Sequence, residues 1–335
     1  MRYISLYLRM VRYRSALVLV LFMLLGAAWH NPLSNFALPL LLIVAALMST
    51  YACATSINDL ADWKIDQINL KGHSDRPLIT GEAKPQDLVS VAIAASVISV
   101  GLGLLVKPLV AILLGAMLLM NMAYSLKPLR ISHRPILTPF YLVIGYIVIP
   151  YLIGVLVVGS KLGGGDVLFL PALYFLFLAR ISLKDFRDRE GDAKNNKPTF
   201  ILNYGKAATC YLSLASLLVG GSLLLVSVHK MPLLIIGLGA YLIALAATEI
   251  RLLKTKDKLV ELISIGFGAR IGNGMIFILL GILLLKQSQA DLPPQVLFYV
   301  SITALYIFTF LEFWRNPQAF QFGNKVVTDG ISRAK

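Results

Sequence analysis

The chain has 335 residues, of which 58% are hydrophobic and only 14% are charged, and its mean hydropathy is +0.77. A soluble globular domain has about a quarter of its residues charged, so this composition excludes one and indicates a membrane protein. The net charge of +14 does not indicate nucleic-acid binding, because the basic residues follow the pattern that orients a membrane protein.

Apolar runs long enough to cross a hydrocarbon core of ~30 Å recur along the whole chain. The first run follows several arginines, as a signal peptide does, but it is long for one and further runs follow at once, so we interpret it as a retained helix. The ten predicted spans are approximately 14–30, 36–54, 87–106, 109–125, 137–157, 167–183, 208–228, 232–250, 260–285 and 294–313. The sequence therefore predicts an all-α polytopic membrane protein.

Basic residues between these spans predict the orientation of the chain. If the N-terminus lies in the cytoplasm, 26 of the 31 Lys and Arg residues fall on the cytoplasmic side. The opposite side holds Lys107, Lys161, Lys230 and Lys286. This asymmetry follows the positive-inside rule and predicts an even number of spans, in what we expect to be a bacterial inner membrane. Arg270 lies inside a predicted span, where it either meets an acidic substrate group or reaches the interface.

Two acidic segments with identical spacing follow the second and sixth predicted spans. The first reads "NDLADWKID" and places aspartates at 59, 62 and 66; the second places them at 185, 188 and 192. Each copy continues into a basic residue followed by proline, at 76–77 and at 197–198. Positions i, i+3 and i+7 of a helix lie within an arc of ~60°. If each span continues by two turns, two acidic stripes face each other across a central cavity.

The chemistry of these stripes favours a site for a metal ion and a diphosphate. The alternative interpretation is that the aspartates only form solvated helix faces. Two observations count against it: neighbouring carboxylates repel one another unless cations bridge them, and the same spacing occurs twice. Ligand sets made only of oxygen suit Mg²⁺, above all when phosphate completes the coordination shell. Cations predicted in the same layer are Arg76, Lys127, Arg130, Arg134, Lys184 and Lys197. We interpret Arg76, Lys127 and Arg130 as functional, and Arg134 as ordinary positive-inside charge.

Four ordered motifs resemble those of the UbiA superfamily of intramembrane prenyltransferases. They are "NDLADWKID" (58–66), "DRPLITGE" (75–82), "YSLKPLR" (124–130) and "KDFRDREGDAKNNKPTF" (184–200). The resemblance covers roughly residues 5–285 and implies a bundle of nine transmembrane helices around a central cavity. The predicted span 294–313 departs from that pattern. We therefore expect a prenyltransferase-like bundle over 1–290 and an additional transmembrane helix with a cytoplasmic tail over 291–335.

The resemblance also implies which residues form the active site. Asn58, Asp59, Asp62 and Asp66 would serve one Mg²⁺, and Asp185, Asp188 and Asp192 a second, with all six aspartates catalytic. Asn58, Arg76, Tyr124, Lys127, Arg130 and Lys184 would bind the diphosphate. Metal ions and basic side chains would stabilise the departing diphosphate while the acceptor attacks an allylic cation that is shielded from water.

The acceptor is the part of the reaction that the motifs leave open. We place a small aromatic acceptor of quinone-type biosynthesis first, with an isoprenyl diphosphate donor and membrane lipid as the other partners and no nucleic acid. The same fold allows prenylation of a glycerol phosphate ether lipid, phosphoribosyl transfer to a lipid phosphate, or terpene cyclisation. Rivals of other classes are a transporter and a scaffold. A transporter is disfavoured, because the charged residues inside transporters usually lie near the bilayer midplane, whereas most of those in this chain are predicted at one face of the membrane.

Overall fold

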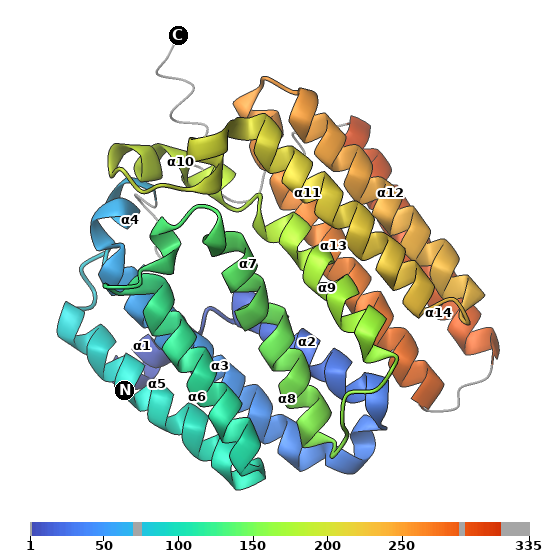
Figure 1. Ribbon diagram of the computed structural model, residues 1–335, viewed down its shortest axis with the longest axis horizontal. Coiled ribbons are helices and arrows are strands. Elements are labelled where there is room, and N and C mark those ends of the chain that lie inside the picture. Colours follow the sequence, from blue (N-terminus) through green and yellow to red (C-terminus); the bar gives the residue numbers. More distant parts are fainter. Residues whose placement is uncertain (1, 70–75, 288–291, 316–335) are drawn as a thin grey trace.

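The computed structural model describes residues 2–69, 76–287 and 292–315, and these ranges contain helices and turns without a strand. The helices are α1 (Arg2–Val11), α2 (Tyr13–His30), α3 (Ala37–Ala61), α4 (Trp63–Asn69), α5 (Pro85–Val106), α6 (Pro108–Ser125), α7 (Leu137–Val143), α8 (Ile149–Val157), α9 (Asp166–Ile181), α10 (Asp185–Lys194), α11 (Phe200–Ser227), α12 (Pro232–Lys254), α13 (Lys258–Gln287) and α14 (Leu292–Arg315). Figure 1 shows α4 and α10 together at one end of the bundle. We call it the acidic end, because both aspartate motifs lie there.

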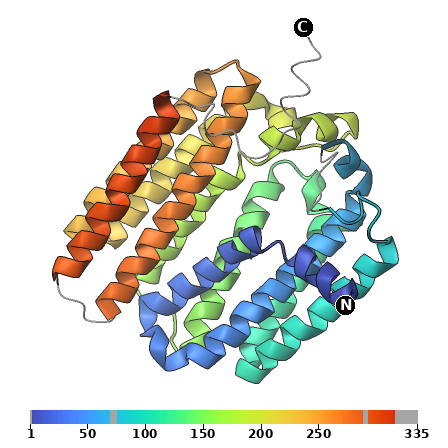
Figure 2. The same cartoon turned by 180° about the vertical axis from the view of Figure 1, so that it is seen from behind.

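The number of membrane-spanning helices agrees with the resemblance. Within the described ranges, seven helical segments are long and apolar enough to cross a membrane, and the bent pairs α1–α2 and α9–α10 raise the number to nine. The predicted all-α polytopic bundle is thus confirmed. Helix α14 lies at the position of the tenth predicted span and packs against α12 and α13 (Figure 2). It is not among the helices identified as candidate spans in the described residues, so a tenth crossing stays a prediction.

A break in the helix lies within the first aspartate motif and directly before the second, so neither span continues straight by two turns, which was the condition for two facing stripes. Helix α3 ends at Ala61, Asp62 leaves the helical conformation, and α4 begins at Trp63. Helix α9 ends at Ile181, and α10 begins at Asp185 with a bend of 51°. A straight polar continuation would project away from the bundle. The breaks instead bring α10 into contact with α4, so that the two motifs lie side by side.

A turn of π-helix, Ile144–Val148, interrupts the span formed by α7 and α8. Pro150 explains its position, because a proline has no backbone N–H to donate and its ring crowds the carbonyl four residues earlier. That carbonyl belongs to Tyr146, in the middle of the turn. A π-turn rotates the side chains on either side of it relative to one another, and such turns often mark functional sites.

Helices α2 and α8 pack backbone against backbone at two glycines. A Cβ atom at Gly154 would overlap the carbonyl oxygen of Met23, and one at Gly26 would overlap that of Tyr151. Small residues allow helices to approach closely in membranes, where packing rather than the hydrophobic effect holds them together. This contact fixes the two central helices relative to each other.

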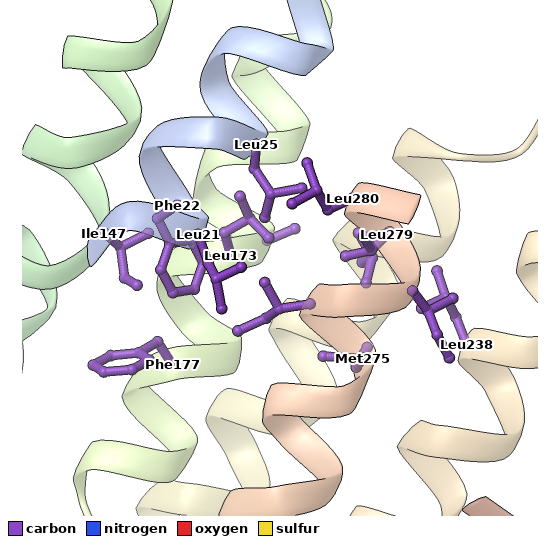
Figure 3. Close-up of a cluster of buried hydrophobic side chains, with 14 of the residues drawn as sticks. Leu21, Phe22, Leu25, Ile147, Leu173, Phe177, Leu238, Met275, Leu279 and Leu280 are labelled. Atoms are coloured by element: carbon purple, nitrogen blue, oxygen red, sulfur yellow. The ribbon is translucent and has the colours of Figure 1, made fainter. Parts of the chain in front are cut away.

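The largest apolar cluster joins α2, α9, α12 and α13 in the middle of the bundle. Figure 3 shows Phe22 and Leu25 of α2 beside Leu173 and Phe177 of α9, with Met275 of α13 on the other side. The rings of Phe22 and Phe177 meet edge to face, with centroids 5.9 Å apart. This cluster supports the bundle below the polar residues of the acidic end.

Candidate active site at the acidic end of the bundle

A cavity of about 270 Å³ lies at the acidic end, and residues of both aspartate motifs line it. The first motif contributes Asn58, Asp62 and Asp66, and the second contributes Asp188 and Asp192. The two motifs therefore meet in space, as their matched spacing predicts. Two carboxylates from each side of one cavity provide the oxygen ligands that a hard cation prefers.

Lys197 connects the two motifs directly. Its Nζ lies 3.0 Å from Oδ2 of Asp62 and 3.8 Å from Oδ1 of Asp192. Both carboxylates are almost fully buried, with 4% and 1% of their residues' surface exposed. A buried carboxylate needs a cation or a hydrogen-bond donor. The ammonium group of Lys197 provides the positive charge for both carboxylates. It thereby holds the segment after α10 against the end of α3.

Asp59 is buried beside the cavity rather than in its wall. Arg12 contacts Oδ2 of Asp59, and Nη1 of Arg76 lies 2.5 Å from Oδ1. Arg76 also lies 3.6 Å from Asp66. Both arginines line the cavity, whereas Asp59 does not. In this arrangement Asp59 holds two guanidinium groups at the cavity wall.

Asp185 has the corresponding place in the second motif. Nζ of Lys184 donates to Oδ1 of Asp185 over 2.7 Å, and Lys184 but not Asp185 lines the cavity. Burial disfavours the lysine charge, but the neighbouring carboxylate outweighs it and raises the pKa of Lys184 above its ordinary value. In each motif, the first aspartate thus lies behind the cavity wall and pairs with basic side chains, whereas the second and third aspartates line the cavity.

Two carboxylates that line the cavity bind protons unusually well. Burial, together with the nearby charges of Asp59 and Asp62, raises the pKa of Asp66 to about 7, although Arg76 opposes the shift. Burial likewise raises the pKa of Asp192 to about 6, against the effect of Lys197. A bound cation would stabilise the charged form of these two carboxylates, because its positive charge takes the place of the proton.

The remaining predicted residues divide into those at the wall and those outside it. Tyr124 lines the cavity. Arg130 lies outside its lining, with Nη2 3.5 Å from Oδ1 of Asp62. Lys127 is exposed and does not line the cavity. Arg270 is exposed on α13, and it too lies outside the lining.

The cavity also contains residues that the sequence did not indicate. Arg12 joins it from the break between α1 and α2, Arg187 from α10, and Tyr146 from the π-turn. No spacing in the sequence distinguishes Arg12 from the other N-terminal arginines, whose charges the positive-inside rule explains. Pro150 within an apolar run was the available signal for the π-turn. Farther from the acidic end the lining is largely apolar, with Leu19, Ala54, Met117, Met120 and Leu142.

The donor set fits a cation that shares its ligands with a substrate. Across residues 2–69, 76–287 and 292–315, no three Asp, Glu, His or Cys side chains are grouped closely enough to hold a metal ion by themselves. The aspartates at the wall instead form two separate pairs. Mg²⁺ usually binds to one or two carboxylates plus phosphate oxygens, rather than in a cage made of protein alone.

The fold and this site define a class of protein: a multi-pass integral membrane protein whose helical bundle has, at one end, a cavity lined by both acidic and basic side chains. The UbiA prenyltransferase family model matches residues 16–267. The chain belongs to this family, which confirms the resemblance in its motifs, and the protein is an intramembrane prenyltransferase.

Relatives with known names come from archaea. The digeranylgeranylglyceryl phosphate synthase of Methanospirillum hungatei is 32% identical over 187 residues, which cover 53% of this chain and 61% of the relative. The synthase of the same name from Methanosarcina mazei is 28% identical over 262 residues, or 72% of this chain and 84% of the relative.

Solved structures share the fold. One, from structural work on digeranylgeranylglyceryl phosphate synthase in membranes, has a TM-score of 0.64 and 19% identity, covering 85% of this chain and 99% of the other. A UbiA homolog from Archaeoglobus fulgidus bound to GPP and Mg²⁺ also has a TM-score of 0.64, with 16% identity over 83% of this chain and 99% of the other.

Proposed function

We propose that this prenyltransferase moves an isoprenyl chain from an isoprenyl diphosphate to the hydroxyl group of a glycerol phosphate ether lipid, with Mg²⁺ as cofactor. The names of the archaeal relatives favour this acceptor over the aromatic acceptor and the quinone pathway that we expected from the sequence. The observation that carries the proposal is the cavity in which Lys197 bridges Asp62 and Asp192. We further propose that this cavity faces the cytoplasm.

Asp62 and Asp66 on one side, and Asp188 and Asp192 on the other, would hold the Mg²⁺ ions together with oxygens of the diphosphate. The structures of the Archaeoglobus homolog with GPP or DMAPP and Mg²⁺ support this assignment by analogy. Mg²⁺ held by these four aspartates would supply positive charge to stabilise the diphosphate as a leaving group.

Basic side chains of the cavity assist the departure of the diphosphate. Arg76, Lys184 and Lys197 are each held by an aspartate, so their charges are in position before the substrate binds. Preorganised charge of this kind stabilises a transition state without further reorganisation. Tyr124 and Asn58 also line the cavity and can donate hydrogen bonds to diphosphate oxygens.

The apolar lining of the cavity would hold the first isoprene units. An allylic cation reacts with water, so the carbon that carries the charge must be kept dry until the acceptor oxygen attacks it. Met117, Met120 and Leu142 provide such a surface next to the polar wall. The acceptor oxygen then forms the new C–O bond, and the hydroxyl proton is released.

Purified full-length protein tests this function directly. We expect prenylated lipid and diphosphate to form together when an isoprenyl diphosphate, an alkylglycerol phosphate and Mg²⁺ are all present, and EDTA to stop both. Asp62→Asn and Asp192→Asn should lower the rate by on the order of 10²- to 10³-fold, because each removes charge from the cavity wall. Glu190→Gln, an exposed change on α10, is the matched control and should keep the rate.

Two outcomes would reject the proposal. Prenylation of a phenolic acid without any prenylation of the alkylglycerol phosphate would restore the aromatic acceptor. Diphosphate release that needs no acceptor and yields a cyclised hydrocarbon would assign the chain to terpene cyclisation.

A further inference from the structure

Arg180 lies inside the bundle, on α9, four residues before Lys184. Its Nη1 donates to Oδ1 of Asn273 on α13. Its guanidinium carbon lies 5.7 Å from the centre of the Phe177 ring. The residue as a whole is half-buried.

Arg180 differs from the cations around the cavity in its choice of partner. Those cations contact aspartates: Arg12 and Arg76 contact Asp59, Arg130 and Lys197 contact Asp62, Lys184 contacts Asp185, and Arg187 contacts Asp188. Arg180 contacts a neutral amide. In the part of the chain that the structure describes, no carboxylate lies within 4.0 Å of its guanidinium.

A charge in this position is unfavourable without an anion. Inside a helical bundle in a membrane, a cation loses its hydration, and arginines there normally pair with acids or mark a substrate path. The amide of Asn273 accepts from one nitrogen, whereas a guanidinium has five N–H donors in a planar fork. That fork matches two oxygens of a phosphate group. The side chain is therefore built to receive an anion that the protein does not supply.

Arg180 and Asn273 adjoin the cavity wall but are not part of its lining. Ile181, the residue after Arg180, lines the cavity, and Tyr146 in the cavity wall stacks on Phe177 with ring centroids 5.5 Å apart. Lys184, which binds the diphosphate in the proposed function, lies four residues later in the chain, in the break between α9 and α10. A phosphate at Arg180 thus sits near the reacting groups but deeper in the bundle than the diphosphate.

The surroundings of Arg180 fit a lipid. Phe177 and Met275, one turn or less from Arg180 and Asn273, begin the apolar cluster of the bundle (Figure 3). Both side chains are buried, so they close the bundle on this side of Arg180. The surface that would receive the alkyl chain is the apolar part of the cavity lining, with Met117, Met120 and Leu142. A small water-soluble anion gains nothing from that surface, whereas the alkyl chain of a lipid does.

We infer that Arg180 and Asn273 bind the phosphate of the lipid acceptor and orient its hydroxyl toward the donor. This inference rests on the proposed function, because it gives the acceptor phosphate of that reaction its binding site. It assigns the two phosphorylated substrates to different cations: the donor to those of the acidic end, and the acceptor to Arg180.

Steady-state kinetics of Arg180→Gln test the assignment. We expect the KM for an alkylglycerol phosphate to rise on the order of 10- to 100-fold, the usual effect of losing a charge-assisted hydrogen bond, while the KM for the donor changes less than about twofold. Arg180→Lys should recover part of the loss. Asn273→Ala, which removes only the orienting contact, should raise the same KM by a smaller factor and serves if Arg180→Gln does not fold.

Binding without turnover separates this inference from the proposed function. Isothermal titration of the full-length protein with alkylglycerol phosphate should show weaker binding to Arg180→Gln, and titration with the phosphate-free alkylglycerol should show no difference between variant and wild type. Retained Arg180-dependent binding with no prenylation by the wild type would reject the function but keep the phosphate site. Equal loss for both lipids, or a donor KM that rises as much as the acceptor KM, would overturn the phosphate site.

Discussion

Lys197 shows how one side chain can join two halves of an active site. It lies after α10, yet its ammonium group contacts an aspartate of each motif, one from the α3–α4 break and one from α10. Burial disfavours its charge, but Asp62 and Asp192 outweigh this effect and raise the pKa of Lys197. The lysine therefore stays charged at neutral pH and keeps both carboxylates in place.

Replacing Lys197 by alanine should thus affect catalysis more than folding of the bundle. We expect kcat/KM to fall on the order of 10²-fold, because the variant lacks a preorganised positive charge that stabilises the departing diphosphate. The measurement is diphosphate release at saturating Mg²⁺. Lys194→Ala is the matched control: Lys194 is exposed and pairs with Glu190 one turn earlier on α10, an interaction that contributes little. Equal effects of both changes would contradict a bridging role.

At the residue scale, the spacing of the aspartates carried information about where they lie. The repeated pattern of aspartates identified Asp62, Asp66, Asp188 and Asp192, which all line the cavity. It could not show that the first aspartate of each motif turns away, since that depends on arginine and lysine partners brought in by the fold. The sequence does not single out Arg180, for a different reason: it lies near the end of the predicted span 167–183, where an arginine is interpreted as orienting charge.

At the scale of elements, hydropathy predicted the spans well but not their interruptions. All ten predicted apolar runs coincide with helices of the structure, because length and composition largely determine whether a segment can form a membrane-spanning helix. The bends at Asp62 and before α10 lie in polar segments that hydropathy does not describe. Which way such a segment turns depends on the partner that it meets, here α4 against α10.

The contact of α2 with α8 gives a prediction at this scale. Gly154→Ala should destabilise the protein by about 1–3 kcal/mol, the usual effect of overpacking, because its Cβ would meet backbone atoms that cannot move aside. The apparent Tm in detergent measures the effect. Gly239→Ala on α12 is the control, since no atom lies within 4 Å of a Cβ there, and it should leave the Tm unchanged or slightly higher. A Tm for Gly154→Ala equal to that of the control would argue against the close contact.

For the whole molecule, the distribution of charge connects the fold to its orientation. The bundle places α10 at the acidic end and the loop with Lys161 at the other (Figure 1). Most of the basic residues in the sequence belong to segments at the acidic end, so the positive-inside rule predicts that this end faces the cytoplasm. Water-soluble isoprenyl diphosphates would then reach the cavity from the cytoplasm, and the lipid acceptor from the membrane.

Single cysteines can test this orientation in intact cells. The native residues Cys53 and Cys210 are 2% and 0% exposed, so a membrane-impermeant maleimide should give little background. Lys161→Cys, at an exposed position, should react from outside the cytoplasmic membrane, whereas Glu190→Cys on α10 should react only after the membrane is permeabilised. The reverse pattern would place the cavity on the outer side, away from the phosphorylated donor, and would require the donor to be supplied there.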